Sequence, residues 1–490
     1  MKALNRSLLT GDDKVRSDEA LQSPIRVLQI GEGNFLRGFA DWMIQTCRNQ
    51  GLFDGAIAVV QPRPSGKAKI DKLAGQDGVY TLVTRGLEDG KTVERKEIVS
   101  VFSEAFDPYS EWEKLVRIAV SPDLKIVFSN TTEAGLVYRP EPLPAAGGAI
   151  ESFPGKIAFL LHARFEALRD AAGSGLLFLP CELLDRNGDA LRDAVLRYAD
   201  DWGYSQAFKD WVVKRNRFLN SLVDRIVTGY PPEEQAEAWF SEWGYRDDLL
   251  VTAEPYHLWA IEGGPEWEDV LPFRKAGLNV HWTNDLSAFQ LRKVRILNGA
   301  HTWMTPLGLL HGVETVGELL QHPELGAAVR DAVYRSIVPS LPGPSAEVTA
   351  YADSVFERFA NPFIRHRLAD IAMNSLSKFK TRLLPTLASY ADRGEPLPDL
   401  LLRGWAGLLR YYRVKRREDG SFEGTSLGGV PYKVRDDAAA LERIASVWEE
   451  SASEEQAIRG LLADEALWGR DLNVWNGAAE ALAGIIREWN

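Results

Sequence analysis

Residues 25–38 decide the fold of this chain, and they read Ile25-Arg26-Val27-Leu28-Gln29-Ile30-Gly31-Glu32-Gly33-Asn34-Phe35-Leu36-Arg37-Gly38. The first six residues have the apolar content and the length of a buried strand. The pattern that follows predicts a helix over residues 35–49 and a second strand over residues 56–60. A strand, a helix and a strand in this order form the unit from which a doubly wound parallel sheet is built.

Three glycines, Gly31, Gly33 and Gly38, lie at the junction between this strand and its helix. Glycines at such a junction permit a tight turn and let a pyrophosphate approach backbone N–H groups. The spacing is G-x-G-x4-G rather than the usual G-x-G-x-x-G, so the alternative is a turn that needs a positive φ and binds nothing. We predict a dinucleotide-binding site here, with Gly31 and Gly33 in its first loop.

Two further polar stretches follow predicted strands. Val59-Val60-Gln61-Pro62-Arg63 lacks the acid that usually accepts hydrogen bonds from the adenosine ribose. Gln61 is the candidate for that contact and Arg63 the candidate for a 2′-phosphate, so this strand leaves the choice between NAD and NADP open. Ser129-Asn130-Thr131-Thr132-Glu133-Ala134-Gly135 is expected beside a nicotinamide, and the alternative is a capping box that begins the next helix.

The character of the chain changes beyond about residue 190. Before that point we predict a hairpin over residues 79–84 and 92–101, a helix over 108–120, and strands over 124–129 and 176–179. After it, helical periodicity dominates and strands are expected to be scarce apart from residues 278–281. The predicted helices span residues 285–310, 323–338, 345–359, 364–388, 397–412 and 436–449. We therefore expect an α/β domain with a doubly wound parallel sheet over residues 1–283 and a mostly α-helical domain over residues 284–490.

Composition excludes several classes of protein. The chain has 490 residues, of which 45% are apolar, and 57 Lys and Arg against 69 Asp and Glu give a net charge of −12. An acidic chain argues against nucleic acid as a partner, and no apolar run approaches the ~18 residues that a membrane span needs. Cys47 and Cys181 are too few for a disulfide framework, and the N-terminus lacks a signal-like apolar stretch. We expect a cytoplasmic protein that is a monomer or a weak homo-oligomer.

The most informative segment is Leu291-Arg292-Lys293-Val294-Arg295-Ile296-Leu297-Asn298-Gly299-Ala300-His301. On an ideal helix, Lys293, Asn298 and His301 project at roughly 0°, 140° and 80°, so all three occupy one hemisphere. Lys293 could exchange a proton with a carbonyl or hydroxyl oxygen, Asn298 could donate a hydrogen bond to that oxygen, and His301 could orient it. The alternative is a solvated basic face, for which Arg292, Lys293 and Arg295 are typical. No His or Cys spacing predicts a metal site.

Together these motifs resemble the long-chain, zinc-independent polyol dehydrogenases, the mannitol dehydrogenase family. The resemblance runs from about residue 25 to about residue 475. Besides the loop, where Asn34, Phe35 and Arg37 complete the family's G-x-G-x-F-x-R pattern, it rests on Ser129 to Gly135, Cys181 to Gly188, Ser221-Leu222-Val223-Asp224-Arg225-Ile226, Lys293-x4-Asn298-x2-His301, Arg358 to Pro362 and Ser377-Lys378.

The resemblance implies a Rossmann-type domain, a helical domain and an active site between them. Lys293 is implied as general acid/base, Asn298 as oxyanion-type donor and His301 as a substrate-orienting partner, with Asp224 and Lys378 lining the same site. The family's polyol-binding pattern is altered at Leu183, Gln290 and Asp370, so mannitol is not the expected substrate. The implied activity is the NAD-dependent, reversible reduction of D-tagaturonate to D-altronate, without a metal, in hexuronate breakdown.

Rival interpretations are a sister activity (reduction of fructuronate or oxidation of mannitol) and a non-catalytic dinucleotide-binding sensor. The Glu32-Gly33-Asn34-Phe35 loop argues against the sister activities, and the joint presence of Lys293, Asn298 and His301 argues against the sensor. A sugar-acid substrate carries a carboxylate that needs a charged partner. Lys378 is the first candidate for holding the substrate, and Arg382 or Lys380 is a weaker candidate for the carboxylate.

Overall fold

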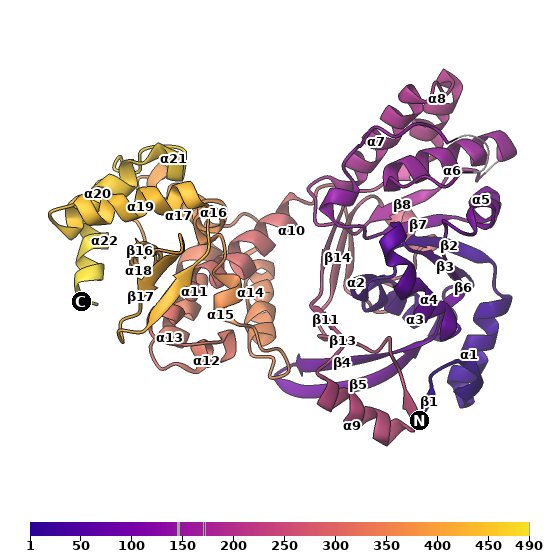
Figure 1. Ribbon diagram of the computed structural model, residues 1–490, viewed down its shortest axis with the longest axis horizontal. Coiled ribbons are helices and arrows are strands. Elements are labelled where there is room, and N and C mark those ends of the chain that lie inside the picture. The colour runs from indigo at the N-terminus through magenta and orange to yellow at the C-terminus, as the bar shows by residue number, and fades with distance from the viewer. Residues whose placement is uncertain (145–147, 170, 172, 490) are drawn as a thin grey trace. The chain divides into compact units, whose positions relative to one another are not determined.

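The computed structural model describes residues 1–144, 148–169, 171 and 173–489. It separates into two compact units, Met1–Leu286 and Ser287–Asn490 (Figure 1).

The first unit is built on a six-stranded sheet in which every neighbouring pair is parallel. From edge to edge its strands are β6 (Phe102–Phe106), β3 (Ala56–Val60), β2 (Ile25–Ile30), β7 (Ile126–Ser129), β8 (Leu177–Pro180) and β9 (Arg217–Phe218). Numbered by their sequence within the sheet, they run in the order 3-2-1-4-5-6, which is the Rossmann order. The order reverses between β2 and β7, which makes this the topological switch point of the sheet. The predicted α/β fold class is confirmed.

Both faces of this sheet are buried, which explains why its strands read as continuous apolar runs. Val27 and Ile57 belong to one hydrophobic cluster, and their neighbours Leu28 and Ala58 belong to the other. Helix α3 (Ala40–Asn49) contributes to the first cluster. The second cluster is formed with α5 (Trp112–Val120), α6 (Phe153–Leu168), α7 (Asn187–Asp201) and α8 (Gln206–Arg215), which lie together in Figure 1.

The predicted hairpin is confirmed as β4 (Tyr80–Glu88) and β5 (Lys91–Val99), which pair antiparallel. It belongs to a second sheet with β11 (Val227–Gly229) and β13 (Val251–Ala253). The remaining elements of the unit are β1 (Lys2–Ala3), β10 (Ser221–Asp224), β12 (Tyr245–Arg246), β14 (Leu258–Glu262), β15 (Val280–Thr283), α1 (Gly11–Gln22), α4 (Lys67–Gly75) and α9 (Glu233–Trp243). The prediction of scarce strands beyond residue 190 was wrong, because strands of two to five residues are too short to show a period.

The single helix predicted over residues 35–49 was also wrong. The chain forms a short α2 (Asn34–Arg37), breaks, and restarts as α3. At the break Gly38 passes so close to the second sheet that a Cβ there would lie 2.8 Å from Val227 Cγ1. The helix predicted from residue 108 begins only at Trp112.

The second unit is mostly helical. Its helices are α10 (Ser287–Arg292), a π-helical turn (Lys293–Leu297), α11 (Asn298–Leu310), α12 (Val316–Gln321), α13 (Leu325–Ala332), a second π-helical turn (Val333–Ile337), α14 (Ser345–Phe359), α15 (Leu368–Ile371), α16 (Ser375–Arg382), α17 (Leu384–Asp392), α18 (Asp399–Tyr411), α19 (Ala438–Glu450), α20 (Glu454–Ala463), α21 (Glu465–Trp468) and α22 (Ala478–Arg487). A small antiparallel sheet joins β16 (Val414–Arg416), β17 (Phe422–Thr425) and β18 (Pro431–Val434). The helix predicted over residues 285–310 is continuous from Ser287 to Leu310 with the first π-helical turn inside it, whereas the helix predicted over residues 364–388 is divided into α15, α16 and α17.

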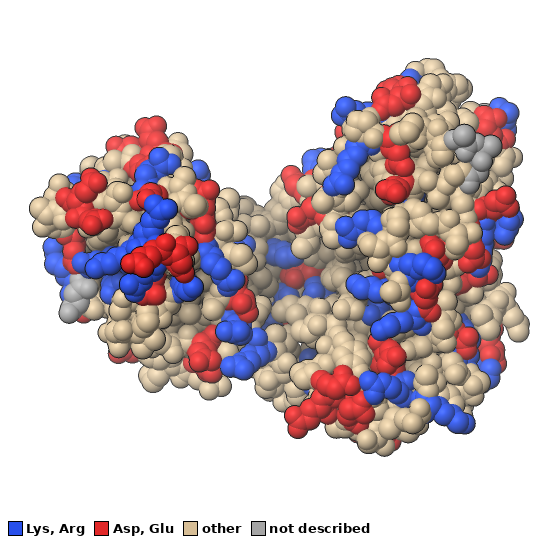
Figure 2. Space-filling model, in the orientation of Figure 1, with Lys and Arg blue, Asp and Glu red and all other residues tan. Residues whose placement is uncertain are grey.

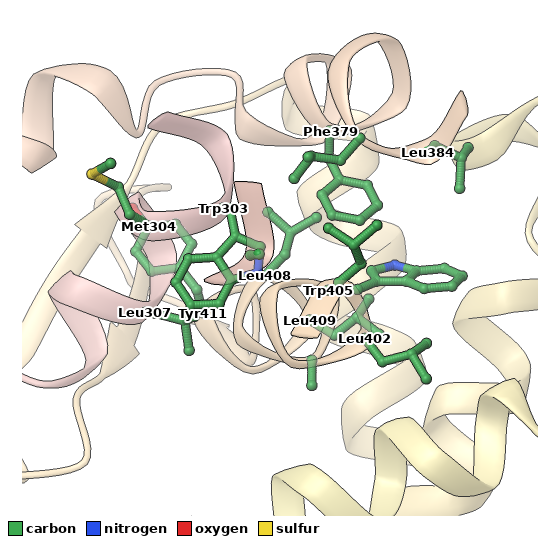
Figure 3. Close-up of a cluster of buried hydrophobic side chains, with 14 of the residues drawn as sticks. Trp303, Met304, Leu307, Phe379, Leu384, Leu402, Trp405, Leu408, Leu409 and Tyr411 are labelled. Carbon is green, nitrogen blue, oxygen red and sulfur yellow. The ribbon is translucent and has the colours of Figure 1, made fainter. Parts of the chain in front are cut away.

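Helix α11 is anchored by aromatic packing against α18. Trp303 and Trp405 are fully buried and lie in one cluster with Leu307 and Leu408 (Figure 3). The two helices approach closely at Gly404, where a Cβ would lie 2.2 Å from Trp303 Cδ1. This packing fixes the position of the helix that carries Asn298 and His301.

Acidic and basic side chains are interspersed on the face shown in Figure 2. In the described part of the chain, no helix combines the length and the apolar character needed to cross a membrane.

Candidate functional site

The first loop of the Rossmann sheet has one glycine that is structurally required and one that leaves space. Gly31 has a φ of +133°, and a Cβ on it would lie 2.9 Å from the Asn130 carbonyl oxygen. Gly33 caps α2, and a Cβ there would meet no atom within 4 Å. Phe35 faces inward and stacks on Phe39 with ring centroids 4.9 Å apart. The open backbone at Gly33 gives a phosphate group room to approach the loop.

Arg37 braces this loop from inside. It is 5% exposed, donates hydrogen bonds to the carbonyls of Leu249 and Glu32, and donates another to Asn34 Oδ1 at 2.6 Å. Its guanidinium also lies 5.1 Å from the centroid of the Tyr80 ring. Burial lowers the pKa of Arg37. The side chain therefore ties the loop to the backbone just before β13 of the second sheet.

Arg225, from the Ser221 to Ile226 motif, is a second internal brace. Its Nη1 donates to the Gly38 carbonyl at 2.6 Å, its Nε to the Glu254 carbonyl at 2.9 Å and its Nη2 to Thr84 Oγ1 at 3.2 Å. The guanidinium lies over the Trp42 ring, and burial lowers the pKa of Arg225 to about 10. This side chain links two motifs that are 187 residues apart.

A buried carboxyl group lies beneath the same loop. Gln29 Nε2 donates to the Gly31 carbonyl at 3.0 Å and to Asp41 Oδ2 at 3.2 Å, and the Tyr80 hydroxyl lies 3.4 Å from the same oxygen. Asp41 is fully buried, and its Oδ1 has no hydrogen-bond partner among the described residues. Burial raises the pKa of Asp41 to about 8, so its proton is held beside the loop.

Glu182 organises the end of β7 from the neighbouring strand. It is 2% exposed and accepts hydrogen bonds from the Thr131 N–H at 2.8 Å, the Thr131 hydroxyl at 3.0 Å and the Ser129 hydroxyl at 3.0 Å. Asn130 Nδ2 donates to the Cys181 carbonyl at 3.2 Å. Burial raises the pKa of Glu182, and these donors oppose that shift. Asn130 and Thr131 are therefore held at the sheet edge by polar contacts.

The chain after Thr131 is strained. Thr132 has a φ of +75°, which a β-branched residue rarely adopts outside functional sites, and it forms no side-chain cap on the short 3-10 helix Glu133–Gly135. The capping-box alternative is therefore not supported, and Glu133 is exposed. The same stretch lines a pocket together with the segment after β3 and the start of α6. Its lining residues are Pro62, Arg63, Thr131, Thr132, Ala134, Gly135, Val137, Arg139, Glu151, Ser152 and Phe153.

Gln61 and Arg63 point to different places. Gln61 is fully buried, and its Nε2 donates to Asp107 Oδ1 at the end of β6, 2.6 Å away. Arg63 is exposed and lines the pocket described above.

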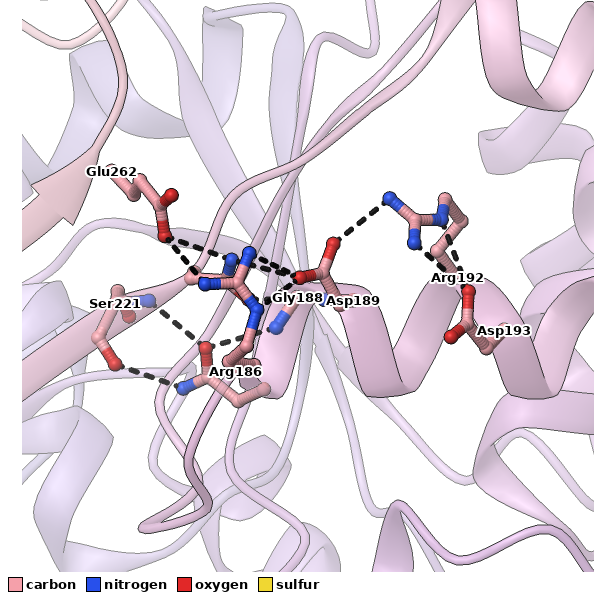
Figure 4. A network of polar contacts seen from close by, with 9 residues as sticks. Arg186, Gly188, Asp189, Arg192, Asp193, Ser221 and Glu262 are labelled. Carbon is pink, nitrogen blue, oxygen red and sulfur yellow. Dashed lines mark hydrogen bonds and ion pairs between the residues drawn. The ribbon is translucent and has the colours of Figure 1, made fainter. Parts of the chain in front are cut away.

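A polar network positions the strand that carries Asp224 (Figure 4). The buried Asn187 side chain accepts a hydrogen bond from the Ser221 N–H at 2.9 Å and donates to the Ser221 carbonyl at 3.1 Å. Beside it Arg186 pairs with Asp189 at 2.5 Å. Asp224, at the end of β10, is 7% exposed.

In the second unit, a π-helical turn sets the spacing of Lys293, Asn298 and His301. The Asn298 N–H donates to the Lys293 carbonyl, five residues back rather than four. The projection from an ideal helix was therefore wrong for this segment. With one extra residue in the turn, the three side chains follow the equivalent of an i, i+4, i+7 spacing and lie within about 60° of one another. They share a narrow stripe instead of a hemisphere.

The polar groups on this stripe are poised for a ligand. Asn298 is partly exposed, and no described residue forms a hydrogen bond with its side-chain amide. His301 is 8% exposed, and its Nε2 is buried without a partner in the described part of the chain. Its ring lies 4.4 Å from the Phe359 ring and 5.0 Å from the His366 ring, measured between centroids. Burial, followed by the charge of His366, holds the pKa of His301 well below its ordinary value, so the imidazole is neutral.

Lys378 and Arg382 both lie on α16, four residues apart and hence on one side of the helix. Lys378 Nζ donates to the Ile371 carbonyl at 2.8 Å, and burial lowers its pKa. Arg382 Nη1 donates to Thr302 Oγ1 at 3.3 Å, next to His301. Among the described residues, no group of three or more His, Cys, Asp or Glu side chains is arranged to hold a metal ion.

Comparison with known proteins matches both units to one family. Residues 25–269 match the mannitol dehydrogenase Rossmann domain, and residues 285–485 match the mannitol dehydrogenase C-terminal domain. The chain belongs to the mannitol dehydrogenase family. The resemblance inferred from the motifs is confirmed, and as a member of this family the chain is an oxidoreductase acting on CH–OH groups.

Curated relatives within the family share the name altronate oxidoreductase. That of Halalkalibacterium halodurans is 42% identical over 100% of this chain and 96% of its own length. The Bacillus subtilis enzyme is 41% identical over 93% of this chain and 91% of its own length, and the Escherichia coli enzyme is 38% identical over 99% and 97%.

Solved structures in the family share the fold. Pseudomonas fluorescens mannitol 2-dehydrogenase, in a ternary complex with NAD and D-mannitol, superimposes with a TM-score of 0.63 at 23% identity over 96% of this chain and 92% of its own. A D-sorbitol dehydrogenase in substrate-free form gives a TM-score of 0.74 at 21% identity over 95% of this chain and 96% of its own.

Sequence reasoning missed Asp41, Glu182 and Arg225 as supports of the site. Glu182 and Arg225 lie inside motifs that were quoted for the resemblance, and their place in those motifs was the available signal. Asp41 lies in a helix with nothing in its spacing to mark it.

The buried Asp41 makes stability depend on pH. In the unfolded chain its carboxyl group titrates near its ordinary pKa of 3.8, whereas in the folded protein the pKa is about 8. The folded state therefore retains a proton that the unfolded state loses, and this group removes stability as pH rises from about 4 to about 8. Asp41→Asn should flatten the fall of the thermal unfolding midpoint between pH 5 and pH 8. The exposed Asp12→Asn is the control, and equal slopes in the two variants would contradict the assignment.

Proposed function

We propose that this chain is an NAD-dependent oxidoreductase that reduces D-tagaturonate to D-altronate, reversibly and without a metal. The observation that carries the proposal is the single stripe formed by Lys293, Asn298 and His301 around a π-helical turn. The shared name of the relatives in three organisms supports this substrate within the family. We assign cofactor binding to residues 1–283, and substrate binding and proton transfer to residues 284–490. Asp224, although it belongs to the first unit, is also assigned to substrate binding.

The residues at the edge of the Rossmann sheet fit a dinucleotide. Gly31 supplies the tight turn and Gly33 leaves the backbone open. We assign the cofactor site to Gly31, Gly33, Asn34, Phe35, Arg37, Gln61, Asn130, Thr131 and Glu133. Arg37 and Gln61 contribute from beneath, because their side chains are buried in internal hydrogen bonds. When bound, NADH supplies the hydride that the ketone carbon accepts.

Proton transfer is assigned to Lys293. It donates a proton to the ketone oxygen during reduction and takes it back from the alcohol in the reverse direction. The unpartnered amide of Asn298 donates a hydrogen bond to the same oxygen, where negative charge develops. The neutral His301 uses its free Nε2 to orient a neighbouring hydroxyl of the substrate, and Lys378 helps hold it.

We place the protein in the cytoplasm, and the state of its two thiols supports this proposal. Cys47 and Cys181 are both buried and free, and burial raises their pKa values, so neither is suited to disulfide exchange. This supports a reducing cytoplasm.

The proposed activity is tested by following NADH absorbance with a panel of ketones. D-tagaturonate should be reduced with a kcat/KM well above those of D-fructuronate, D-fructose and D-tagatose. NADH should be preferred to NADPH; a higher kcat/KM with NADPH would reverse the cofactor assignment and make Arg63 the residue to mutate. Turnover of D-fructose or D-mannitol as fast as that of D-tagaturonate and D-altronate would refute the proposed substrate.

Removing the proposed proton donor should slow catalysis without unfolding the protein. Lys293→Ala should lower kcat by about 10²- to 10⁴-fold, because general acid catalysis by a positioned group contributes on this scale. The thermal midpoint and NADH binding should stay unchanged, since Lys293 is a partly exposed residue outside the apolar core. Lys415→Ala, an exposed lysine in the same unit, is the control. Activity near that of the wild type in Lys293→Ala would remove Lys293 from the mechanism.

Metal independence is tested by prolonged dialysis against a chelator. Activity should be retained and metal analysis should find no stoichiometric zinc, because the proposed polarising groups are Lys293 and Asn298. Loss of activity that added zinc restores would show that a metal takes part.

A further inference from the structure

The second unit concentrates positive charge around His301. The pKa of His301 is lowered first by burial, then by the neighbouring His366, and then by the positive charges of Arg382, Arg358 and Lys378. Arg358 is 7% exposed at the end of α14, and Arg382 ends α16. Helices α14 and α16 thus bring three cationic side chains close to His301.

Two of the arginines in this region are partly buried without a compensating acid. Arg382 donates to the Thr302 hydroxyl, and its own carbonyl accepts a hydrogen bond from Arg295 Nη1 at 3.3 Å. Burial alone lowers the pKa of both Arg382 and Arg295, and in the described part of the chain neither forms an ion pair. A desolvated charge is costly unless an opposite charge or a ligand compensates it.

Two acidic residues, Asp370 and Asp436, do lie near these cations, but they influence His366 and Lys378 rather than Arg382. Burial lowers the pKa of His366 and of Lys378, and Asp370 and Asp436 respectively oppose these two shifts. Asp436 is itself engaged, since it accepts hydrogen bonds from the Tyr412 hydroxyl and the Leu376 N–H. The cationic surplus is therefore centred on Arg382.

We infer that Arg382 is the specificity-determining residue that receives the carboxylate of the substrate, with Arg358 and Lys378 adding positive charge. The inference rests on the proposed function and goes beyond it by separating Arg382 from Lys380, the other basic residue on α16. Lys380 points elsewhere, because its Nζ lies 3.3 Å from where a Cβ on Gly469 would be. A guanidinium fork suits a carboxylate, since two parallel N–H groups can face its two oxygens.

The spacing along α11 fits such a ligand. In D-tagaturonate the ketone carbon C2 and the carboxylate carbon C6 are separated by four C–C bonds of about 1.5 Å, roughly 5 Å when extended. Asn298, assigned to the ketone oxygen, and Thr302, which contacts Arg382, are four residues apart and hence about 5–6 Å apart on one helix face. Both ends of one molecule can therefore be held from successive turns of the same helix.

D-tagatose provides the matched comparison, because it carries a hydroxymethyl group where D-tagaturonate carries the carboxylate. Arg382→Met should lower kcat/KM for D-tagaturonate by about 10- to 100-fold, the range expected for a lost charged hydrogen bond, mainly through KM. kcat/KM for D-tagatose and the dissociation constant of NADH should change less than about threefold. Lys380→Met removes the same charge from the same helix and should change none of these values. Arg382→Lys should recover part of the loss.

A second readout needs no turnover. D-altronate added without cofactor should raise the thermal midpoint of wild type and Lys380→Met but not of Arg382→Met, since only ligand binding to the folded state stabilises it. Equal loss of activity toward both sugars in Arg382→Met would overturn the inference and show a structural role. A change in NADH affinity alone would also overturn it, because the cluster would then bind the cofactor. A wild type that does not distinguish the two sugars would instead refute the proposed keto-acid substrate.

Discussion

The hydrogen bond from the Asn298 N–H to the Lys293 carbonyl is the constraint on which the proposed chemistry depends. It closes a turn one residue longer than an α-helical turn, and such turns are uncommon and concentrate at functional sites. Ile296 and Leu297 are buried, and the turn packs against the second π-helical turn, Val333–Ile337. The extra residue is thus absorbed while the apolar side of the helix keeps its packing. If the turn were α-helical instead, the angle between the Lys293 and His301 directions would change by about 100°, the rotation per residue of an α-helix.

Two buried arginines give the cofactor loop a comparable rigidity. Arg37 and Arg225 donate most of their hydrogen bonds to backbone carbonyls, among them those of Leu249 and Gly38. An arginine suits this task because its planar fork presents five N–H donors in fixed directions. The strained conformation at Thr132 persists because the surrounding contacts, including the hydrogen bonds from the neighbouring Thr131 to Glu182, hold the chain there. Such pre-organisation is what a dinucleotide site requires.

The sequence predicted what depends on runs of apolar residues and on motif identity. Strands β2 and β3 have the predicted bounds, Ile25–Ile30 and Ala56–Val60, because a strand buried on both faces is largely apolar. Helix α14 also has its predicted bounds, Ser345–Phe359, since Pro344 ends the preceding loop. A π-helical turn inserts a single residue, which a periodicity averaged over several turns cannot register. The five-residue spacing of Lys293 and Asn298 was the available signal, because five residues do not return to one face of an α-helix.

The sequence does not show in which direction a side chain points, because that direction depends on tertiary packing. Gln61 follows β3, where a contact to the ribose is usual, yet its amide donates a hydrogen bond to Asp107 at the end of β6. Lys380 and Arg382 are equivalent as basic residues of one helix, and only the packing of that helix against α11 separates them. Residue type gives a candidate list, whereas the fold decides which candidates face one another.

Buried acids of the first unit and the partly buried Arg382 of the second unit differ in how their charge is compensated, and this difference indicates where a ligand binds. In the first unit, the buried Glu182 accepts three hydrogen bonds, and Asp41, with fewer donors and an unpartnered Oδ1, keeps its proton near neutral pH. These acids are therefore compensated by donors or neutralised. Arginine does not have the second option, because its guanidinium stays charged in proteins. The buried Arg37 and Arg225 donate to several backbone carbonyls, whereas in the described part of the chain the Arg382 guanidinium donates only to the Thr302 hydroxyl and pairs with no acid. An uncompensated cation beside the unpartnered Nε2 of His301 is therefore best explained by a site whose missing charge arrives with the substrate.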